Sequence, residues 1–206
     1  MPFELCNAPV AFRPWINEIL MAHIDMSCIV YLDDVLIYSD TVRQHQKDVS
    51  NIHEAIRKSG MQVKPSKCEC HQSETEYLRF IIGHEAVKTD PVRIHGIWHW
   101  TNPKPVKRIQ GFLGFCNFYP QFIEGFSRTA RPLYAPTKKE CIGKWERGDK
   151  EQEAFDKLST KLTTAPLLLH FNPLTPTMIE RDTSKYRCSR ILSQQCQDRK
   201  WPLVAY

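Results

Sequence analysis

The chain has 206 residues, 42% of them hydrophobic, with a formal net charge of +5 and a pI near 8.7. This length and composition fit one or two domains with an ordinary core. No run approaches the roughly twenty apolar residues of a membrane span, and the N-terminus lacks a charged-then-apolar signal pattern. These features exclude a membrane protein and predict an intracellular one, cytoplasmic or nuclear. The mild basic excess permits a polyanionic partner, although solubility alone gives the same balance.

Eight cysteines are scattered along the chain without paired zinc spacing. Cys68-Glu69-Cys70-His71 is too tight for the usual zinc ribbons, which place two to four residues between cysteines. Free or buried thiols in a reducing compartment are therefore expected.

The first predicted element is a helix that Asn7 can cap. Its inward face is Phe12, Ile16, Ile19, Leu20 and His23. Pro14 lies inside this helix, where it removes a backbone hydrogen bond, so a kink is expected between Val10 and Pro14.

A hairpin follows, in which two apolar runs enclose Tyr31-Leu32-Asp33-Asp34. Successive strand residues face opposite sides, so at most one of Asp33 and Asp34 can point into a sheet unless the tip bends. A buried unpaired carboxylate is costly, which favours a cation there. Mg²⁺ prefers such hard oxygen ligands, but an ordinary hairpin with a solvated Asp-Asp turn would show the same dipeptide.

The middle of the chain predicts a helix, short strands and a helical pair. The first helix starts at Asp40 or Thr41 and ends at Gly60, with Val42, His45, Val49, Ile52 and Ile56 inward. Residues 61–88 form short strands, with apolar runs at 62–64 and 77–82. Asp90-Pro91 starts a helix that ends by Asn102-Pro103, and a second helix covers 106–118 with Ile109, Phe112, Leu113 and Cys116 inward.

The last third predicts a loop, a helix and strands. The Pro- and Lys-rich segment 131–143 is the candidate domain boundary. A helix at 150–162 and strands at 167–171, 177–180, 190–193 and 203–206 follow it.

Several sequence blocks occur in an order and spacing that resemble the reverse transcriptase of gypsy-type LTR retrotransposons, truncated and divergent. The blocks are Met1–Pro9, Tyr31–Ser39, Lys64–Glu69, Glu76–Ile82, Phe112–Tyr119, Trp145, Ala165-Pro166 and Glu180–Ser184. Each block alone is weak, but together they cover essentially the whole chain.

The resemblance implies that Asp33 and Asp34 are catalytic carboxylates that bind Mg²⁺ in a polymerase palm. The family reaction is in-line attack of a primer 3′ hydroxyl on the α-phosphate of a dNTP, with two metals. The third carboxylate and the fingers lie upstream of the Met1 block in the family. We therefore expect the isolated chain to be inactive.

The resemblance also assigns substrate and nucleic-acid contacts. Phe3, Asn7 and Tyr31 correspond to residues at the nucleotide pocket, although Glu4 stands where the family has Gly. Residues 77–82 resemble the hairpin that grips the primer, with Arg79 in place of Gly; its guanidinium could pair with phosphate or be a surface substitution. The expected nucleic-acid-binding residues are Tyr77, Leu78, Arg79, Lys107, Asn117 and Tyr119. The helix that carries the last two could equally serve packing alone.

The C-terminal blocks resemble the start of an RNase H-like domain, with Asp182 as its first catalytic carboxylate. Lys185 and Arg187 replace residues that are uncharged or acidic in the family. A working nuclease site at Asp182 is therefore not expected.

The sequence as a whole predicts an α+β chain. Its parts are the C-terminal part of a reverse transcriptase palm with the Tyr31–Asp34 hairpin (1–88), thumb-like helices (89–135), and a connection with an incomplete RNase H-like α/β sheet (136–206). The expected function is that of a retrotransposon-derived RNA-directed DNA polymerase, with template-primer and dNTPs as partners. The alternative is a non-catalytic nucleic-acid-binding remnant.

Overall fold

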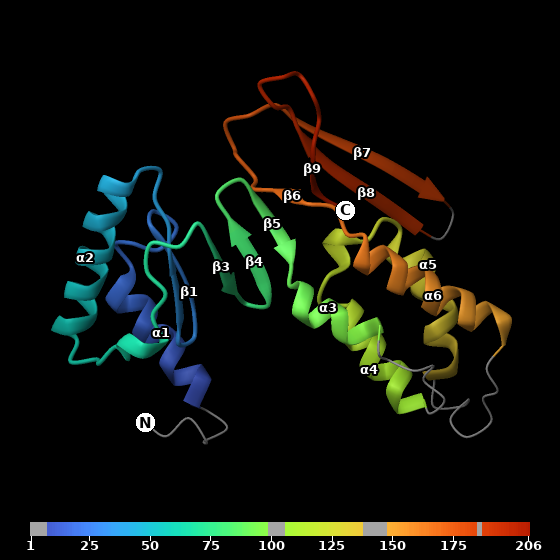
Figure 1. Cartoon of the computed structure of the whole chain (residues 1–206), viewed down its shortest axis with the longest axis horizontal. Coiled ribbons are helices and arrows are strands. Elements are labelled where there is room, and N and C mark those ends of the chain that lie inside the picture. The colour runs from blue at the N-terminus through green and yellow to red at the C-terminus, as the bar shows by residue number, and fades with distance from the viewer. Residues whose placement is uncertain (1–7, 99–105, 138–147, 185–186) are drawn as a thin grey trace. The chain divides into compact units, whose positions relative to one another are not determined.

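The computed structural model describes residues 8–98, 106–137, 148–184 and 187–206. The chain divides into two compact units, Met1–Gln72 and Ser73–Tyr206 (Figure 1). Each unit combines helices with antiparallel strands, which confirms the expected mixed class. No helix in the described ranges is both long and apolar enough to cross a bilayer.

The first unit packs two helices against a two-stranded hairpin. Its elements are α1 (Ala8–Leu20), β1 (Cys28–Tyr31), β2 (Asp34–Ile37), α2 (Val42–Lys58) and the short 3₁₀ helix η1 (Pro65–Lys67). The core consists of Ile16, Leu20, Cys28, Ile52 and Ile56. The apolar face predicted for the first helix is confirmed at Ile16 and Leu20. Pro14 lies inside α1, and the kink expected between Val10 and Pro14 stays a prediction.

Helix α2 begins and ends where the sequence predicts. The side chain of Thr41 caps its N-terminus by accepting a hydrogen bond from the Gln44 amide at 3.2 Å, and Gly60 follows its end with φ of +79°. The predicted inward position of Val42 is wrong, because this side chain is 72% exposed. The buried stripe instead runs through Asp48, Ile52 and Ile56, which leaves Val42 at its margin.

The second unit begins with a four-stranded antiparallel sheet in the order β3-β4-β5-β6. The strands are β3 (Glu74–Tyr77), β4 (Phe80–Gly83), β5 (Ala86–Thr89) and β6 (Leu168–Leu169). The predicted strand at 62–64 is wrong, since these residues are exposed and pair with no neighbouring strand. The apolar run 77–82 is broken by a two-residue turn, so it forms parts of two strands.

The second unit contains four α-helices, of which α4, α5 and α6 share one core. They are α3 (Pro91–Trp98), α4 (Val106–Cys116), α5 (Phe126–Tyr134) and α6 (Asp149–Thr163), with the 3₁₀ helices η2 (Pro120–Phe122) and η3 (Ala135–Thr137). The predicted start of α3 is confirmed, because the Asp90 carboxylate accepts a hydrogen bond from the Val92 amide at 2.9 Å. The predicted inward residues of α4 are all buried.

Helix α5 was not predicted from the sequence. The expected loop at 131–143 is wrong over its first residues, because the helix continues through Pro132 to Tyr134. Residues 138–143 lie outside the described part. Phe112 of α4 and Phe155 of α6 have ring centroids 4.5 Å apart. The predicted boundary between 135 and 136 therefore separates helices that pack on each other, and the three-part domain division remains a prediction.

The remaining strands form a three-stranded antiparallel sheet in the order β7-β8-β9. They are β7 (Thr177–Ser184), β8 (Arg187–Gln194) and β9 (Leu203–Ala205). The strands predicted in this region are confirmed, although β7 and β8 are longer than expected.

Candidate functional site

The tip of the β1–β2 hairpin is a tight turn with a strained backbone. Tyr31 pairs with Asp34, which leaves Leu32 and Asp33 as a two-residue turn. Leu32 has φ of +54°, a left-handed conformation that is uncommon for a residue other than glycine. Such conformations cost about 1–3 kcal/mol and are concentrated at functional sites.

The two carboxylates at this tip are exposed to solvent. Among the described residues, neither Asp33 nor Asp34 forms an ion pair or a side-chain hydrogen bond. The nearby cation is engaged elsewhere, since the Arg13 guanidinium lies over the Tyr31 ring at 5.8 Å from its centroid. Adjacent carboxylates without partners fit a hard divalent cation, which commonly takes one or two such ligands from a protein.

The described residues do not complete a metal centre by themselves. No group of three or more His, Cys, Asp or Glu side chains with suitable placement occurs in these ranges. Asp33 and Asp34 could therefore supply two ligands of a site whose remaining ligands come from elsewhere.

A buried carboxylate behind the hairpin was missed by sequence reasoning. Asp48 of α2 accepts hydrogen bonds from the Ser39 hydroxyl at 2.6 Å and from the side-chain amide of Gln44 at 2.9 Å. The Ser39 bond is the main reason that the pKa of Asp48 lies below its usual value, and the Gln44 bond adds to it. Ser39 lies two residues after the end of β2, so its bond to Asp48 ties the outgoing strand of the hairpin to α2.

The β3–β4 hairpin also has a two-residue turn. Tyr77 pairs with Phe80, so Leu78 and Arg79 are the two turn residues, with φ of +50° and +68°. Two left-handed residues in succession are the pattern of a type I′ turn, which strongly prefers Asn-Gly. The Arg79 guanidinium lies 5.2 Å from the centroid of the Phe118 ring.

The expected nucleic-acid-binding residues differ in exposure. Tyr77 and Tyr119 are buried, at 8% and 1% exposure, and so they form part of the core. Arg79, Lys107 and Asn117 are exposed, and Leu78 is half-buried. The Asn117 side-chain oxygen accepts a hydrogen bond from the Tyr134 hydroxyl at 2.9 Å. The exposed side chains of Arg79, Lys107 and Asn117 are therefore the ones that can contact a ligand most directly.

Asp182 lies on β7, opposite Ser189 of β8. Its side chain is 77% exposed, and the nearest described cation is the Arg128 guanidinium at 3.9 Å. An exposed pair of this kind contributes little stability. Asp182 belongs to the second unit and Asp33 and Asp34 to the first, while Phe3 and Asn7 lie outside the described residues.

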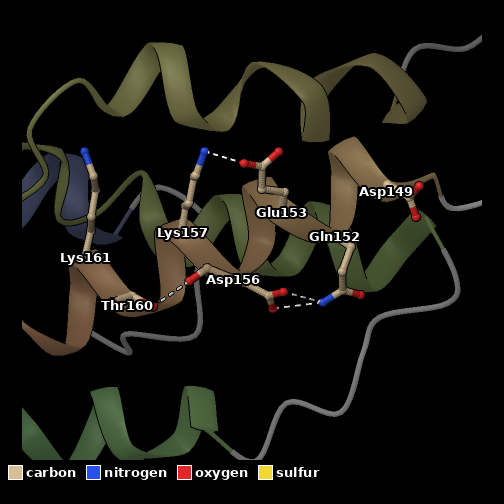
Figure 2. Close-up of a pocket in the computed structure, with 7 residues that line it drawn as sticks. All are labelled: Asp149, Gln152, Glu153, Asp156, Lys157, Thr160 and Lys161. Atoms are coloured by element: carbon tan, nitrogen blue, oxygen red, sulfur yellow. Dashed lines mark hydrogen bonds and ion pairs between the residues drawn. The ribbon is translucent and has the colours of Figure 1, made fainter.

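A hollow of about 550 Å³ along α6 contains none of the predicted site residues. Figure 2 shows its lining side chains, all from this one helix: Asp149, Gln152, Glu153, Asp156, Lys157, Thr160 and Lys161. Lys157 bonds Glu153 at 2.6 Å, and the Asp156 carboxylate accepts from Gln152 at 2.8 and 2.9 Å. These groups satisfy one another, so the hollow is the solvated face of a helix.

Two family models match most of the chain. Residues 1–82 match the model of the reverse transcriptase (RNA-dependent DNA polymerase), and residues 147–206 match the RNase H-like domain found in reverse transcriptase. The chain is therefore related to the reverse transcriptases, as the sequence blocks predicted. The hairpin with Asp33 and Asp34 falls within the first match, and Asp182 falls within the second.

Its relatives are polyproteins of retrotransposons. The Transposon Tf2-3 polyprotein of Schizosaccharomyces pombe is 29% identical over 206 residues, which are 100% of this chain and 15% of the polyprotein. The retrovirus-related Pol polyprotein from transposon opus of Drosophila melanogaster is 28% identical over 213 residues, covering 99% of this chain and 21% of that protein. The chain thus corresponds to a reverse-transcriptase-like part of retrotransposon Pol polyproteins and spans a small share of their length.

Solved structures of foamy viral protease-reverse transcriptase have the same fold. The complex with double-stranded DNA aligns with a TM-score of 0.81 and 20% identity, covering 100% of this chain and 43% of that one. The complex with an RNA/DNA hybrid aligns with a TM-score of 0.78 and 19% identity, covering 100% of this chain and 28% of that one. At these identities the similarity establishes the fold.

Proposed function

We propose that the chain supplies the metal-binding hairpin and a duplex-binding unit of an RNA-directed DNA polymerase. In this proposal residues 1–88 are the C-terminal part of the palm, 89–135 the thumb-like helices, and 136–206 the connection and an RNase H-like segment. The observation that carries it is the strained β1–β2 turn, which presents Asp33 and Asp34 to solvent without a partner among the described residues.

Each tip residue has a role in nucleotidyl transfer. Asp33 and Asp34 would hold divalent cations, with Mg²⁺ the expected ion. A bound pair of metals supplies activation of the primer 3′ hydroxyl and neutralisation of the triphosphate. Tyr31, held under the Arg13 guanidinium, together with Phe3 and Asn7, would line the nucleotide pocket. The strain of the turn fixes the carboxylates before a cation binds, which reduces the reorganisation needed at the site.

A titration of the whole chain with Mn²⁺, followed by NMR, tests this role. Paramagnetic broadening is expected to be strongest at the amides of residues 31–35 and to disappear when Asp33→Asn and Asp34→Asn are combined. The matched control combines Asp149→Asn and Asp156→Asn, which removes the same charge from the hollow on α6. Broadening that survives the first pair and disappears with the second contradicts the proposal.

A second candidate function is duplex binding without catalysis. It is favoured by the exposed Arg79 and Lys107 of the second unit and by Arg128, whose guanidinium lies beside Asp182 where a nuclease would need a metal. Template-primer is the proposed ligand, in line with the DNA and RNA/DNA hybrid in the foamy viral structures. The proposed contacts are Leu78, Arg79, Lys107 and Asn117, with Tyr77 and Tyr119 beneath them.

Fluorescence anisotropy with a labelled duplex tests this candidate. Binding is expected to be weak and to fall steeply with salt, because phosphate contacts release counterions. Lys107→Ala is expected to reduce the slope of log affinity against log salt by about 1. Binding that is absent at low salt, or insensitive to salt, contradicts duplex recognition through phosphates.

A further inference from the structure

We propose that Tyr119 and Phe118 are positioning residues. Tyr119 holds the Leu78–Arg79 turn in one conformation and Phe118 holds the Arg79 side chain, so that Arg79 presents a preorganised cation to a nucleic-acid phosphate. This inference rests on the duplex binding proposed above. It assigns Tyr119 a role inside the protein instead of at the ligand, since this side chain is 1% exposed.

The turn needs such support because its own sequence disfavours its conformation. Leu78 and Arg79 both carry a Cβ atom, yet both have left-handed backbones. A type I′ turn is formed readily by Asn-Gly, whose residues tolerate positive φ. Leu-Arg does not, so contacts from outside the turn must stabilise this geometry.

Tyr119 provides one such contact through its hydroxyl group. The hydroxyl donates a hydrogen bond to the backbone carbonyl oxygen of Arg79 at 3.0 Å. The ring is fixed by edge contacts with Phe80 and Phe122, at centroid distances of 5.5 and 6.2 Å. Burial raises the pKa of the Tyr119 phenol, so the hydroxyl keeps the proton that it donates. The peptide after Arg79 is thereby held in one orientation.

Phe118 provides the second contact, to the side chain of Arg79. Its ring stacks on Phe80 at 5.1 Å with an interplanar angle of 20°, and the Arg79 guanidinium lies over it. A guanidinium above an aromatic ring is attracted to the ring face and keeps its N–H donors at the edge. These donors can then reach a phosphate without loss of the stacking contact.

Charges around the turn leave Arg79 available for an anion. Arg93 is engaged with Glu76 at 3.0 Å and with Asp90 at 3.1 Å. Arg79 has no ion pair with any residue in the described ranges, and its side chain is exposed. A phosphate group of a nucleic-acid backbone is the anion that matches a single, oriented guanidinium of this kind.

The test uses Tyr119→Phe, which removes one hydroxyl and keeps the ring. In the whole chain we expect the carbon chemical shifts of Leu78 and Arg79 to move away from left-handed values, and duplex affinity at low salt to fall about fivefold. The affinity loss should vanish when Arg79→Ala is already present, since Tyr119 acts through Arg79. Tyr134→Phe, which removes an exposed hydroxyl bonded to Asn117, should leave the turn shifts unchanged.

Phe118→Leu is the second variant, because it keeps the hydrogen bond and removes the ring under the guanidinium. It should lower duplex affinity while the backbone shifts of Arg79 stay left-handed. Unchanged turn shifts in Tyr119→Phe, or equal affinity losses with and without Arg79, overturn the inference. Failure of the unmodified chain to bind any duplex overturns the proposed duplex binding, whereas the turn shifts still decide whether Tyr119 positions the turn.

Discussion

The two hairpin turns of this protein both contain left-handed residues, and their side chains carry opposite charges. The β1–β2 turn places Leu32 at φ of +54°, and the β3–β4 turn places Leu78 and Arg79 at +50° and +68°. The first turn carries two carboxylates without a partner among the described residues. The second carries a cation that rests on Phe118 and a carbonyl that is bonded to Tyr119.

This difference indicates where each turn obtains its stability. The β3–β4 turn is held by aromatic side chains of its own unit, so it is complete without a ligand. Among the described residues, the β1–β2 hairpin is held by pairing between its strands, by the Arg13 contact with Tyr31 and by the Ser39–Asp48 bond, and none of these contacts reaches the two carboxylates. A bound cation should therefore stabilise the acidic tip more than it stabilises the β3–β4 turn.

The largest expected effect is at Phe80, which directly follows the β3–β4 turn. Phe80→Ala removes the stacking contact with Phe118 and the edge contact with Tyr119, and should cost the second unit about 2–3 kcal/mol. Urea unfolding followed by NMR signals of each unit measures this loss. Leu174→Ala, at a side chain that is 91% exposed, is the control and should have almost no effect. A similar loss in the first unit would show that the two turns do not depend on separate contacts.

At both turns a glycine variant should be more stable than the alanine variant, whereas inside strands alanine is usually the more stable of the two. Arg79→Gly should be more stable than Arg79→Ala by about 1 kcal/mol, because both lose the guanidinium and only glycine fits positive φ freely. Leu32→Gly against Leu32→Ala should give the same sign. Denaturant midpoints measure the differences, and Val35, inside β2, is the control where alanine should be better. Equal stability of the paired variants at Arg79 would mean that the turn is not strained in solution.

Acid should weaken the base of the β1–β2 hairpin. The Ser39 and Gln44 hydrogen bonds hold the pKa of Asp48 below its usual value, and the charges of His23 and His45 lower it further. A depressed pKa contributes stability that is complete above the unfolded value of about 3.9 and is lost as the pH falls through the folded value. Ser39→Ala should therefore reduce the acid sensitivity of the first unit, measured from Ile52 methyl signals between pH 6 and pH 2, taken as roughly the range in which Asp titrates.

Glu54 supplies the control for the acid experiment. The hydrogen bond from Arg57 lowers its pKa as well, but the pair is exposed on the outer side of α2. Glu54→Gln should leave the acid response of Ile52 mostly intact. If Glu54→Gln changes the acid response of Ile52 more than Ser39→Ala does, Asp48 is not the group that makes the first unit sensitive to acid.

The smallest expected effect is on catalysis by the isolated 206-residue chain. Two-metal transfer needs all of its ligands, and the described residues bring together no group of three or more His, Cys, Asp or Glu side chains that could hold a metal. We expect no template-dependent dNTP incorporation with Mg²⁺ or Mn²⁺, and no cutting of RNA in a hybrid. Primer extension above the combined Asp33→Asn and Asp34→Asn variant would contradict the first expectation. Hybrid cleavage that Asp182→Asn abolishes would contradict the second.

Sequence reasoning succeeded where a local signal is sufficient. Three helix ends depend on only two or three adjacent residues each, and all three predictions are confirmed: the cap at Thr41, the end at Gly60 and the start at Asp90-Pro91. The Asp33-Asp34 pair was also recognised locally, because two carboxylates between apolar strands are conspicuous. Their role as metal ligands remains a prediction.

Sequence reasoning failed where a distant partner decides the outcome. Asp48 is buried because Ser39 and Gln44 satisfy its carboxylate, and a charged residue in a helix gives no sign of this. Helix α5 was hidden by Pro132, which usually marks a loop. Arg79 could be a surface substitution by its sequence alone, and only the positions of Phe118 and Tyr119, some forty residues later, show that it is held.

Strand β6 has a consequence for synthesis of the chain on the ribosome. Its residues Leu168 and Leu169 pair with Val87 and Ala86, so the β3–β6 sheet draws its last strand from far downstream. At translation rates of about 5–20 residues per second, roughly 4–16 seconds separate the two strands. During that interval β5 of the nascent chain has an open edge, which is a site for wrong pairing. A chaperone that covers this edge should therefore raise the yield of folded protein.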